Sequence, residues 1–496
     1  MRLERKRPVA YGEKMVATKK RPLVMTEGPL FGKILIFILP LMATNLLQTL
    51  YNAADMIVVG LSAEADAVGA IGVTGSFINL VINVFMGFAT GANVMVARHL
   101  GARDEEQTSR TVHTAIAMSV AFGMIAAVIG LIISRPVLAL MGTTAGKLLD
   151  LATLYCQIYF AGAPAVALTN YLIAIFRAKG DTKTPLVILS VAGLVNVVFN
   201  LFFVLVLHLS VEGVALATVL SNVVSAVLLL IKLTHDKGFC RFSLRRLCFD
   251  RHAFRSIVYI GLPAGVQGSL FSISNMLIQS SILQVNNALA PAGSAYQPVV
   301  KGNAAAANLE GFIYTAQNSV YQASITFTSQ NVGAAKYERV RRVMLCCYLI
   351  SFIVAAIFGF GMLLLREPLL ALYDVTPGTP DTISALAYDA AYSRMLYLFI
   401  PYFFLAFMET GCGVVRGLGK SLSSTFISLV GACLLRIVWI CTVFRANPTL
   451  EIIYLSYPIS WALTAIAQFI CALLSLRHLI KTRKTAEEIH ALSLHH

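Results

Sequence analysis

One short stretch of the chain occurs twice. Residues 98–102 read Arg-His-Leu-Gly-Ala with Arg110 behind them, and residues 330–334 read Gln-Asn-Val-Gly-Ala with Arg342 behind them, so the two copies are 232 residues apart. An internal repeat constrains the fold strongly, because each half of the chain must then form a similar structural unit. We therefore expect two homologous halves of about 220 to 240 residues.

The repeat continues at nearly the same offset along the chain. Further matches are Pro40 with Pro263 (223 apart), Pro164 with Pro401 (237 apart), and residues 177–180 with 416–419 (239 apart). Small loop insertions explain the slow drift in offset. A proline inside a helix removes a backbone hydrogen bond and can bend the helix. The matched prolines therefore predict matched bends in the two halves.

The composition places these halves in a membrane. Hydrophobic residues make up 57% of the chain and charged residues only 13%, which is too apolar for a soluble protein of this length. We predict an all-α, polytopic membrane protein with twelve transmembrane helices, six in each half. The apolar runs lie at about 30–60, 67–97, 111–134, 147–176, 185–208, 212–232, 256–284, 304–330, 343–365, 384–414, 421–444 and 452–476.

The positive charges predict the orientation of these helices. Of the 39 Lys and Arg residues, 32 fall in the tails and loops of one side, six fall on the other side, and Arg436 falls inside a helix. Cationic residues concentrate in cytoplasmic loops, so both termini and the long middle loop are expected in the cytoplasm of a multi-pass plasma membrane protein. The net charge of +15 then reflects orientation rather than nucleic-acid binding.

Five regions follow from this topology. The first 28 residues are basic and lack the apolar core of a signal peptide, so they are expected to form a disordered cytoplasmic tail on anionic lipid. The predicted regions are a basic tail at 1–28, an N-terminal six-helix lobe at 29–232, a cytoplasmic linker at 233–255, a C-terminal six-helix lobe at 256–480 and a second cytoplasmic tail at 481–496.

Five segments in the same order resemble the multidrug and toxic compound extrusion family. They read PLMATNLLQTLYNAADMIVVG from Pro40, RAKGDTKTPLVILSVAGLVNVVFN from Arg177, GVALAT from Gly213, TSQNVGAAK from Thr328 and GVVRGLG from Gly413. The resemblance runs from about residue 30 to residue 480. It implies two six-helix lobes around a V-shaped cavity, and export of amphipathic, often cationic organic compounds in exchange for protons or sodium.

The resemblance also implies particular site residues. Three functional positions of the family carry over by motif: Asp55, Asn196 and Thr218. At the position where many prokaryotic relatives have an aspartate, this chain has Asn200. The seventh predicted helix lacks the glutamate of sodium-coupled relatives and carries Ser272 and Ser274 instead, so the departure disfavours a sodium site of that type and favours the proton as coupling ion.

The position of Asp55 supports the same assignment without the family. An ionisable residue inside a membrane-spanning helix is costly and is therefore a functional candidate. Asp55, Asn200 and Thr218 lie six to eight residues from the outer ends of their predicted helices, which is a depth of about 9 to 12 Å. We expect one polar cluster in which Asp55 takes up a proton from outside and releases it inside, while Asn196 and the other polar residues orient it. The alternative is an aspartate that contacts interfacial water.

The C-terminal half offers three buried-charge candidates. Glu310 and Arg436 are predicted at matched depth, so we expect them to form an ion pair, because an unpaired charge is expensive to bury. A structural pair and a coupling or substrate site both remain open for them. Glu409 lies seven residues before Arg416, and it is expected either to pair with an arginine near the interface or to bind a cation.

Other cationic and aromatic residues are expected to have mainly structural roles. Arg177 and Arg416 mark cytoplasmic helix ends, where arginines can hydrogen-bond terminal carbonyls and hold the topology. Several aromatic residues could line a cavity for flat organic cations, although each is more often packed or lipid-facing. They are Phe85, Phe88, Phe199, Phe271, Tyr314, Tyr402 and Phe403.

Four classes of function can be weighed from these residues. A secondary active exporter, coupled by antiport to a proton or sodium, is favoured. A flippase for a lipid-linked saccharide is the alternative, and it would need a cavity rich in Arg or Lys to hold pyrophosphate, whereas the sequence indicates Arg436 as the only buried cation. An intramembrane enzyme is disfavoured because no HExxH motif, P-loop or nucleophile elbow occurs. A channel fits the two-lobe repeat less well.

We therefore predict that the chain is not an enzyme, that it binds no metal or organic cofactor beyond the coupling ion, and that its partners are small organic substrates and the lipid bilayer. It is expected to work as a monomer and to bind no nucleic acid.

Overall fold

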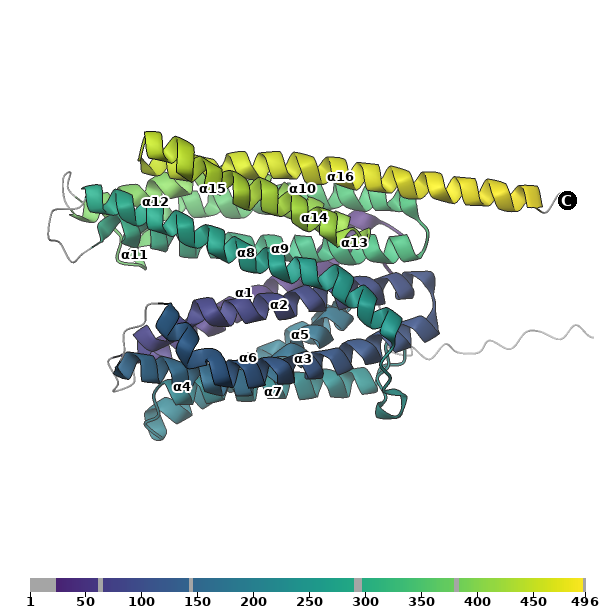
Figure 1. The fold of residues 1–496 in the computed structure, drawn as a ribbon, viewed down its shortest axis with the longest axis horizontal. Coiled ribbons are helices and arrows are strands. Elements are labelled where there is room, and N and C mark those ends of the chain that lie inside the picture. Colours follow the sequence, from purple (N-terminus) through teal and green to yellow (C-terminus); the bar gives the residue numbers. More distant parts are fainter. Residues whose placement is uncertain (1–23, 61–65, 142–145, 290–296, 379–382, 494–496) are drawn as a thin grey trace, which may run out of the picture.

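A computed structural model describes residues 24–60, 66–141, 146–289, 297–378 and 383–493. All regular structure in these ranges is helical. The helices run along one common direction and form two lobes that lie side by side (Figure 1). Most of the predicted basic tail at residues 1–28 lies outside the described residues.

The two halves of the chain supply the two lobes. The first half contains α1 (Leu30–Gly60), α2 (Ala67–Ala102), α3 (Glu105–Leu140), α4 (Lys147–Ala161), α5 (Ala163–Ala178), α6 (Lys183–Leu201), the π-helix η1 (Phe202–Val206) and α7 (Val211–Thr234). The second half follows the short 3-10 helix η2 (Leu244–Arg246) and contains α8 (Arg251–Leu289), α9 (Pro298–Gly333), α10 (Tyr337–Leu364), α11 (Arg366–Ala371), α12 (Ile383–Phe399), α13 (Tyr402–Gly417), α14 (Ser421–Ser428), the π-helix η3 (Leu429–Leu434), α15 (Leu435–Trp439), the π-helix η4 (Ile440–Phe444) and α16 (Leu450–Ser493).

The predicted twelve crossings are consistent with these helices. In the described ranges, nine helices are long and apolar enough to cross a membrane, and the bent pairs α4–α5 and α12–α13 bring the number to eleven. The prediction of twelve crossings requires α9 as the remaining one. Its 36 residues exceed the roughly 20 that a crossing needs, but it carries many polar residues, and residues 319–331 are all buried inside the protein. A helix shielded from lipid does not need an apolar surface.

The prolines produce matched bends, as the repeat predicts. Pro164 stands in the first turn of α5, where α4 and α5 meet at 52°. Pro401 precedes α13, where α12 and α13 meet at 49°. Each proline lacks the N–H that would continue the hydrogen bonding of the helix before it. The bends turn the last segments of both pairs toward the interior of the molecule.

The first helix of each half crosses between the lobes. The beginning of α1, including Phe37, packs against Phe327 of α9 in the other lobe, whereas the end of α1 packs against α6 of its own lobe. The beginning of α8 packs against α2 of the other lobe, where Gly261 and Gly265 face Gly87, and its end joins the core of its own lobe. The glycines are needed because a Cβ on Gly87 would overlap the backbone of α8.

The two copies of the repeated motif meet at one end of the bundle, where α2, α5, α9 and α13 finish. A Cβ on Gly101 would overlap the backbone oxygen of Gln330, and a Cβ on Gly333 would overlap the backbone oxygen of Arg98. Each motif also reaches a helix end of the other lobe: Arg98 donates to the carbonyl of Gly417 at 3.4 Å, and Gln330 donates to the carbonyl of residue 178 at 2.7 Å. We use the name glycine clasp for the packing of Gly101 against Gln330 and of Gly333 against Arg98, together with these two hydrogen bonds.

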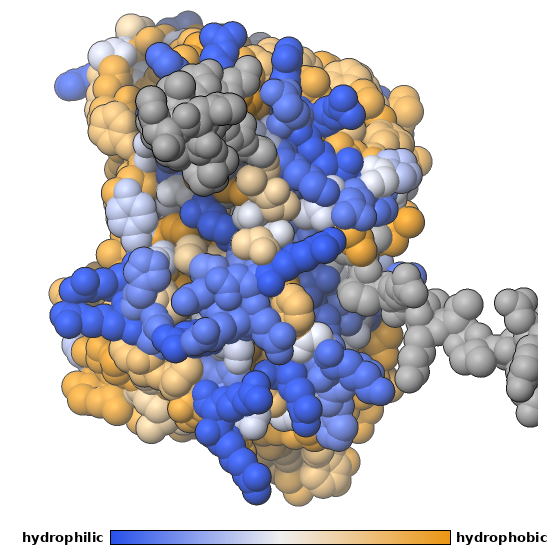
Figure 2. Space-filling view, turned by 90° about the vertical axis from the view of Figure 1, so that its right-hand side faces the viewer, coloured by the Kyte–Doolittle hydropathy of each residue, from blue (hydrophilic) through white to orange (hydrophobic). Residues whose placement is uncertain are grey.

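The end of the bundle that carries the glycine clasp is the basic end. Figure 2 shows this face, on which hydrophilic side chains gather between apolar flanks. The exposed apolar residues of helices such as α3 and α6, including Ile132 and Leu194, lie along the sides of the bundle, as expected for surfaces in contact with lipid. The chain is therefore a multi-pass membrane protein.

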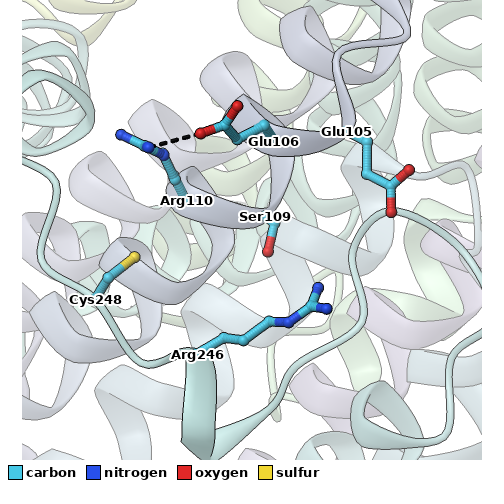
Figure 3. A pocket seen from close by; sticks show the side chains of 6 residues that line it. All are labelled: Glu105, Glu106, Ser109, Arg110, Arg246 and Cys248. Atoms are coloured by element: carbon cyan, nitrogen blue, oxygen red, sulfur yellow. Dashed lines mark hydrogen bonds and ion pairs between the residues drawn. The ribbon is translucent and has the colours of Figure 1, made fainter.

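The linker is held against α3 at the basic end. The ring of His113 lies 3.1 Å from both the backbone nitrogen and the carbonyl oxygen of Ser243, and the Thr114 hydroxyl accepts from the backbone nitrogen of Asp250 at 3.0 Å. Figure 3 shows Arg246 and Cys248 of this linker beside Glu105, Glu106, Ser109 and Arg110 of α3. Because α7 ends at 234 and α8 begins at 251, the linker is shorter than the predicted 233–255.

Both predicted tails also need correction where they are described. Residues 24–28 are docked on the C-terminal lobe: Arg339 donates to the carbonyls of Glu27 and Gly28 at 2.9 and 2.7 Å, and Met25 is fully buried. At the other end, α16 continues as a helix to Ser493, so the predicted tail at 481–496 begins as an extension of the last helix.

Candidate functional site

A cavity of about 830 Å³ lies between the two lobes. The N-terminal lobe lines it with α1, α2 and α4 to α7, and the C-terminal lobe lines it with α8, α9 and α13. The lining runs from Gly72, near the start of α2, to Arg177, in the last turn of α5. The cavity therefore reaches from the glycine clasp toward the opposite end of the bundle, and we call it the central cavity.

The structure brings together the four polar residues predicted in the N-terminal lobe. Asn200 Nδ2 donates to Asp55 Oδ1 at 2.5 Å and lies 3.3 Å from Asn196 Oδ1. The Thr218 hydroxyl donates to the carbonyl of Val214 at 3.0 Å, and Thr218 lines the same cavity wall as Asp55. The predicted cluster is therefore present, whereas its role in coupling stays a prediction.

Close packing of α1 on α6 places this cluster. The ring of Tyr51 fills the space where Gly193 lacks a side chain, and the Tyr51 hydroxyl lies 3.3 Å from the carbonyl oxygen of Ser190. Residues four apart share one face of a helix, so Asp55 follows Tyr51 toward α6. Asn196 and Asn200 face it for the same reason. Asp55, Asn196 and Thr218 line the central cavity, while Asn200 is fully buried behind them.

Glu310 has a different partner from the one predicted. Arg394 of α12 donates to Glu310 Oε2 at 2.5 Å and to Asn303 Oδ1 at 2.8 Å, and Tyr454 donates to the same Asn303 oxygen at 3.2 Å. Arg394 is one of the six cationic residues predicted on the non-cytoplasmic side, but it is buried inside the C-terminal lobe. The predicted pair with Arg436 is therefore wrong, although Glu310 is ion-paired as expected.

Arg436 is held by other groups in the same lobe. It lies between the π-helices η3 and η4, and its Nε donates to the Ser460 hydroxyl at 2.9 Å. Its guanidinium stands 4.2 Å from the ring centroid of Tyr457 and 5.7 Å from that of Trp461. Cation–π contacts of this kind stabilise a desolvated arginine. The prediction that Arg436 is buried is confirmed. Its contacts, however, are a hydroxyl group and aromatic rings rather than the carboxylate of Glu310.

Glu409 and Arg416 lie together in the wall of the central cavity. Arg416 donates to Gln267 Oε1 at 2.7 Å and to the hydroxyl of Tyr321. No ion pair or hydrogen bond joins Glu409 to Arg416 among the described residues, so the predicted pairing of Glu409 with an arginine is not seen, although the two side chains line the same wall. Arg416 contacts side chains rather than the terminal carbonyls that the sequence analysis assigned to it.

Arg177 also lines the central cavity, instead of capping a helix end. It occupies in α5 the place that Arg416 occupies in α13, 239 residues further along. Both arginines are buried, and so are Arg394 and Arg436. The prediction that Arg436 is the only buried cation is therefore wrong. Charge counting missed Arg177 and Arg416 because the bends at Pro164 and Pro401 turn the ends of α5 and α13 inward.

Two of the seven candidate aromatic residues line the cavity, namely Phe271 and Tyr314. Phe85, Phe88 and Tyr402 belong to the packed cores of the lobes. The other two stack on neighbouring aromatic rings, with Phe199 against Phe203 and Phe403 against Phe404. The sequence signal that could have separated these groups is helix phase, because Tyr314 and Phe271 share helix faces with the polar residues Asn318 and Gln267.

Several known proteins are similar to this chain in sequence. The MatE family profile matches residues 40–202 and 272–442. The probable multidrug resistance protein YoeA of Bacillus subtilis is 25% identical over 366 residues, which cover 72% of this chain and 77% of YoeA. YpnP of the same organism, also described as a probable multidrug resistance protein, is 24% identical and covers 83% of this chain and 88% of its own length. The multidrug export protein MepA of Staphylococcus aureus is 24% identical over 55% of this chain and 60% of its own length.

The fold is also similar to solved structures. One describes the outward-facing conformation of a multidrug resistance MATE family transporter, with a TM-score of 0.83 and 20% identity over 94% of this chain and 100% of that chain. Another, from Pyrococcus furiosus, is reported to have a binding pocket of reverse polarity, with a TM-score of 0.83 and 20% identity over 93% of this chain and 99% of that chain. These similarities show the fold.

Three observations point to the same family. They are the two repeated lobes, the cavity between them and the profile match across both halves of the chain. The chain belongs to the MatE family of membrane transporters.

Proposed function

We propose that this chain is a secondary active multidrug exporter that exchanges amphipathic organic compounds, often cationic ones, for protons. The observation that carries this proposal is Asp55, a carboxylate in the wall of the central cavity whose hydrogen-bonding partners are neutral polar groups. The relatives described as multidrug resistance or export proteins support the class of cargo.

The side chain of Asn200 suits a carboxyl group that changes its protonation state. An amide offers both a donor and an acceptor. Asn200 Nδ2 donates to Asp55, whereas Asn200 Oδ1 is buried without a partner in the described part of the chain. The nitrogen can therefore stabilise the carboxylate, and after rotation of the amide the oxygen can accept from the protonated acid. Asp55 can gain and lose a proton while one neighbour satisfies both forms.

The direction of transport follows from orientation. We place the basic end, with the glycine clasp and both chain termini, in the cytoplasm of the plasma membrane, because cationic residues concentrate on that side. The central cavity then faces outward in this conformation. Export would alternate this state with one in which the glycine clasp has separated. We also propose that a single chain suffices for export, because both lobes of the cavity come from one chain.

Efflux from proteoliposomes tests the proposal. Purified protein is reconstituted with ethidium inside, and a pH gradient or a sodium gradient is imposed separately. We expect efflux that is driven by the pH gradient in sodium-free buffer and that stops when a protonophore is added. Efflux that requires sodium and resists the protonophore would contradict proton coupling, and transport that ignores both gradients would contradict antiport.

A second candidate is favoured by a specific observation. A flippase for a lipid-linked saccharide needs cationic side chains in its cavity to hold pyrophosphate, and both Arg177 and Arg416 line the central cavity. The export assay distinguishes the two functions, since a flippase would move a lipid analogue between leaflets and would leave ethidium inside the vesicles.

A further inference from the structure

Arg177 is a buried cation for which the described residues supply no counter-charge. It is 9% exposed, and in the described part of the chain its Nε has no hydrogen-bond partner. No ion pair joins its guanidinium to a carboxylate among the described residues. A buried charge is costly unless it is paired and hydrogen-bonded. The missing partner must therefore come from outside the described protein groups, and the position of Arg177 in the cavity wall gives a ligand access to it.

A second donor without a partner lies beside it. Asn93 Oδ1 accepts from the Thr326 hydroxyl at 3.1 Å, which leaves Asn93 Nδ2 as a buried donor with no acceptor among the described residues. Asn93 and Arg177 line one small recess together with Thr90 and Gln322. The described lining of this recess contains no carboxylate. Its unsatisfied groups are donors, one of them charged, which is the requirement for binding an anionic oxygen.

The recess is a side pocket of the central cavity. Thr90, Arg177 and Gln322 line both. The recess measures about 10 Å³, which is room for one group about the size of a water molecule, whereas the cavity of about 830 Å³ can hold the body of a drug-sized molecule. A compound in the cavity could therefore place one terminal oxygen in the recess.

The equivalent arginine of the other lobe has protein partners for its terminal nitrogens, although its Nε, like that of Arg177, has none among the described residues. Arg416 donates to Gln267 and Tyr321, and the carboxylate Glu409 lines the same cavity wall. An arginine therefore occurs at the equivalent position of both lobes. Arg416 has protein partners for its terminal nitrogens, whereas Arg177 has none among the described residues. This asymmetry makes Arg177 the point at which the central cavity selects for negative charge.

We propose that Arg177 and Asn93 form an oxyanion subsite of the central cavity, which binds a carboxylate or phosphate oxygen of an amphipathic cargo. The inference rests on the proposed export function, because the ligand of the cavity is then the transported compound. The preferred cargo accordingly carries an anionic oxygen group, and it can carry a positive charge as well, since Asp55 and Glu409 line the same cavity.

Two dyes that differ in one group test the subsite. Rhodamine B carries a free carboxylate and its ethyl ester does not, while the coloured cationic ring system is the same. Binding of each dye to the purified full chain in detergent is followed by fluorescence anisotropy, without any gradient. We expect the wild type to bind the acid about tenfold more tightly than the ester, a typical effect of one charge-assisted hydrogen-bonded pair.

Variants assign the preference to the recess. Arg177→Gln should abolish the preference for the acid and leave ester binding unchanged, and Arg177→Lys should keep part of it, because lysine keeps the charge but loses the planar fork. Asn93→Asp should also abolish it, by giving Arg177 an internal carboxylate, and the aspartate can still accept from Thr326. Arg103→Gln is the matched control, because the Arg103 side chain is 80% exposed at the basic end.

A stability measurement separates a ligand site from a structural role. Because the Arg177 side chain has no hydrogen-bond or ion-pair partner to lose among the described residues, Arg177→Gln should unfold at the same temperature as the wild type or at a higher one. Rhodamine B should raise the unfolding temperature of the wild type and should not raise that of Arg177→Gln. A marked loss of stability in Arg177→Gln without any dye would overturn the inference.

A second arm identifies the source of the anionic oxygen. Farnesyl pyrophosphate and farnesol share one lipid chain and differ only in the phosphate groups. Displacement of rhodamine B by farnesyl pyrophosphate but not by farnesol would assign the subsite to lipid phosphates as well as carboxylates, whereas a preference confined to the dye pair would assign it to carboxylates. Equal wild-type affinity within both pairs would overturn the inference. Ethidium efflux is measured separately, so failure of the export proposal is recognised independently.

Discussion

The two lobes share one fold but treat their buried charges differently. In the C-terminal lobe, Glu310 is ion-paired with Arg394, Arg436 is held by Ser460 and lies over the ring of Tyr457, and Glu409 has no ion-pair partner among the described residues. In the N-terminal lobe, Asp55 has only neutral hydrogen-bonding partners and Arg177 has none in the described structure.

The difference suggests that the two lobes, which are copies of one structural unit, have different roles in transport. Paired buried charges resist any change in protonation or ligation, because removing one partner strands the other in a medium of low dielectric. A carboxylate held by neutral groups can exchange a proton at a lower cost. The Glu310–Arg394 pair of the C-terminal lobe is therefore expected to be structural, and Asp55 of the N-terminal lobe is expected to change its protonation state during transport.

The largest expected effect is the loss of export in Asp55→Asn. The substitution keeps the size and hydrogen-bonding capacity of the side chain but removes the exchangeable proton, so the protein should fold normally and lose nearly all ethidium efflux driven by a pH gradient. The matched control is Asp389→Asn, which changes an exposed aspartate of α12 in the other lobe. Undiminished export by well-folded Asp55→Asn protein would remove Asp55 from the mechanism.

The second prediction concerns the ion pair of the C-terminal lobe. Glu310→Gln and Arg394→Met should each lower the stability of the detergent-solubilised protein by about 3 to 5 kcal/mol, because each leaves an uncompensated buried charge. The double variant should lose less than the sum of the two. Thermal unfolding of the four proteins measures the coupling.

The corrected pairing supplies the control for this cycle. Arg436→Met combined with Glu310→Gln should show a smaller coupling than the cycle with Arg394, since Arg436 contacts Ser460 and Tyr457 instead. A larger coupling between Glu310 and Arg436 than between Glu310 and Arg394 would restore the pair predicted from the sequence.

The third prediction compares the halves of the glycine clasp. Gly101→Ala and Gly333→Ala each place a methyl group against a backbone oxygen of the opposite motif, and overpacking of this kind costs roughly 1 to 3 kcal/mol. The two losses should be similar, because the contacts are equivalent by the repeat. Thermal unfolding measures them, with Gly361→Ala as the control, because a Cβ at that position meets nothing within 4 Å. A loss confined to one of the two positions would contradict an equivalent clasp.

The smallest expected effect concerns the joint between the lobes, where Asp250 precedes α8. The backbone N–H of Ala253 donates to Asp250 at 2.8 Å and holds the pKa of that carboxyl below its ordinary value of 3.8. The ionised form is therefore favoured in the folded protein. Its contribution is complete at neutral pH and is lost as the pH falls below the ordinary pKa and through the lowered one.

Two substitutions of Asp250 separate the cap from the charge. Asp250→Ala should cost about 1 kcal/mol at neutral pH through loss of the helix cap. Asp250→Asn keeps a capping oxygen, so it should lose less and should remove this part of the acid dependence. Thermal unfolding at neutral and acidic pH checks both, and an unchanged acid dependence in Asp250→Asn would exclude Asp250 as its source.

The N-terminal cluster could be predicted because all its members lie in regular helices. Residue depth along a helix follows directly from position in the sequence, and this placed Asp55 and Asn200 near each other without knowledge of the fold. The repeat likewise predicted the paired bends at Pro164 and Pro401.

The arginines could not be placed in this way, for a physical reason. Charge bias predicts the side of the membrane on which a helix ends, but not the direction in which its last turn points. The bends at 52° and 49° carry Arg177 and Arg416 into the cavity wall. Arg394 was assigned to the outer side for the same reason, so the true partner of Glu310 was missed. The polarity of α9 also has a tertiary cause, because other helices shield it from lipid.

The most direct test of the division between the lobes is proton release on substrate binding. Purified protein in weakly buffered detergent solution is mixed with ethidium, and a pH indicator records the protons set free. We predict release by the wild type, release by the Glu310→Gln/Arg394→Met double variant, and none by Asp55→Asn. Release that persists in Asp55→Asn and disappears in the double variant would place the exchangeable proton in the C-terminal lobe and contradict the account.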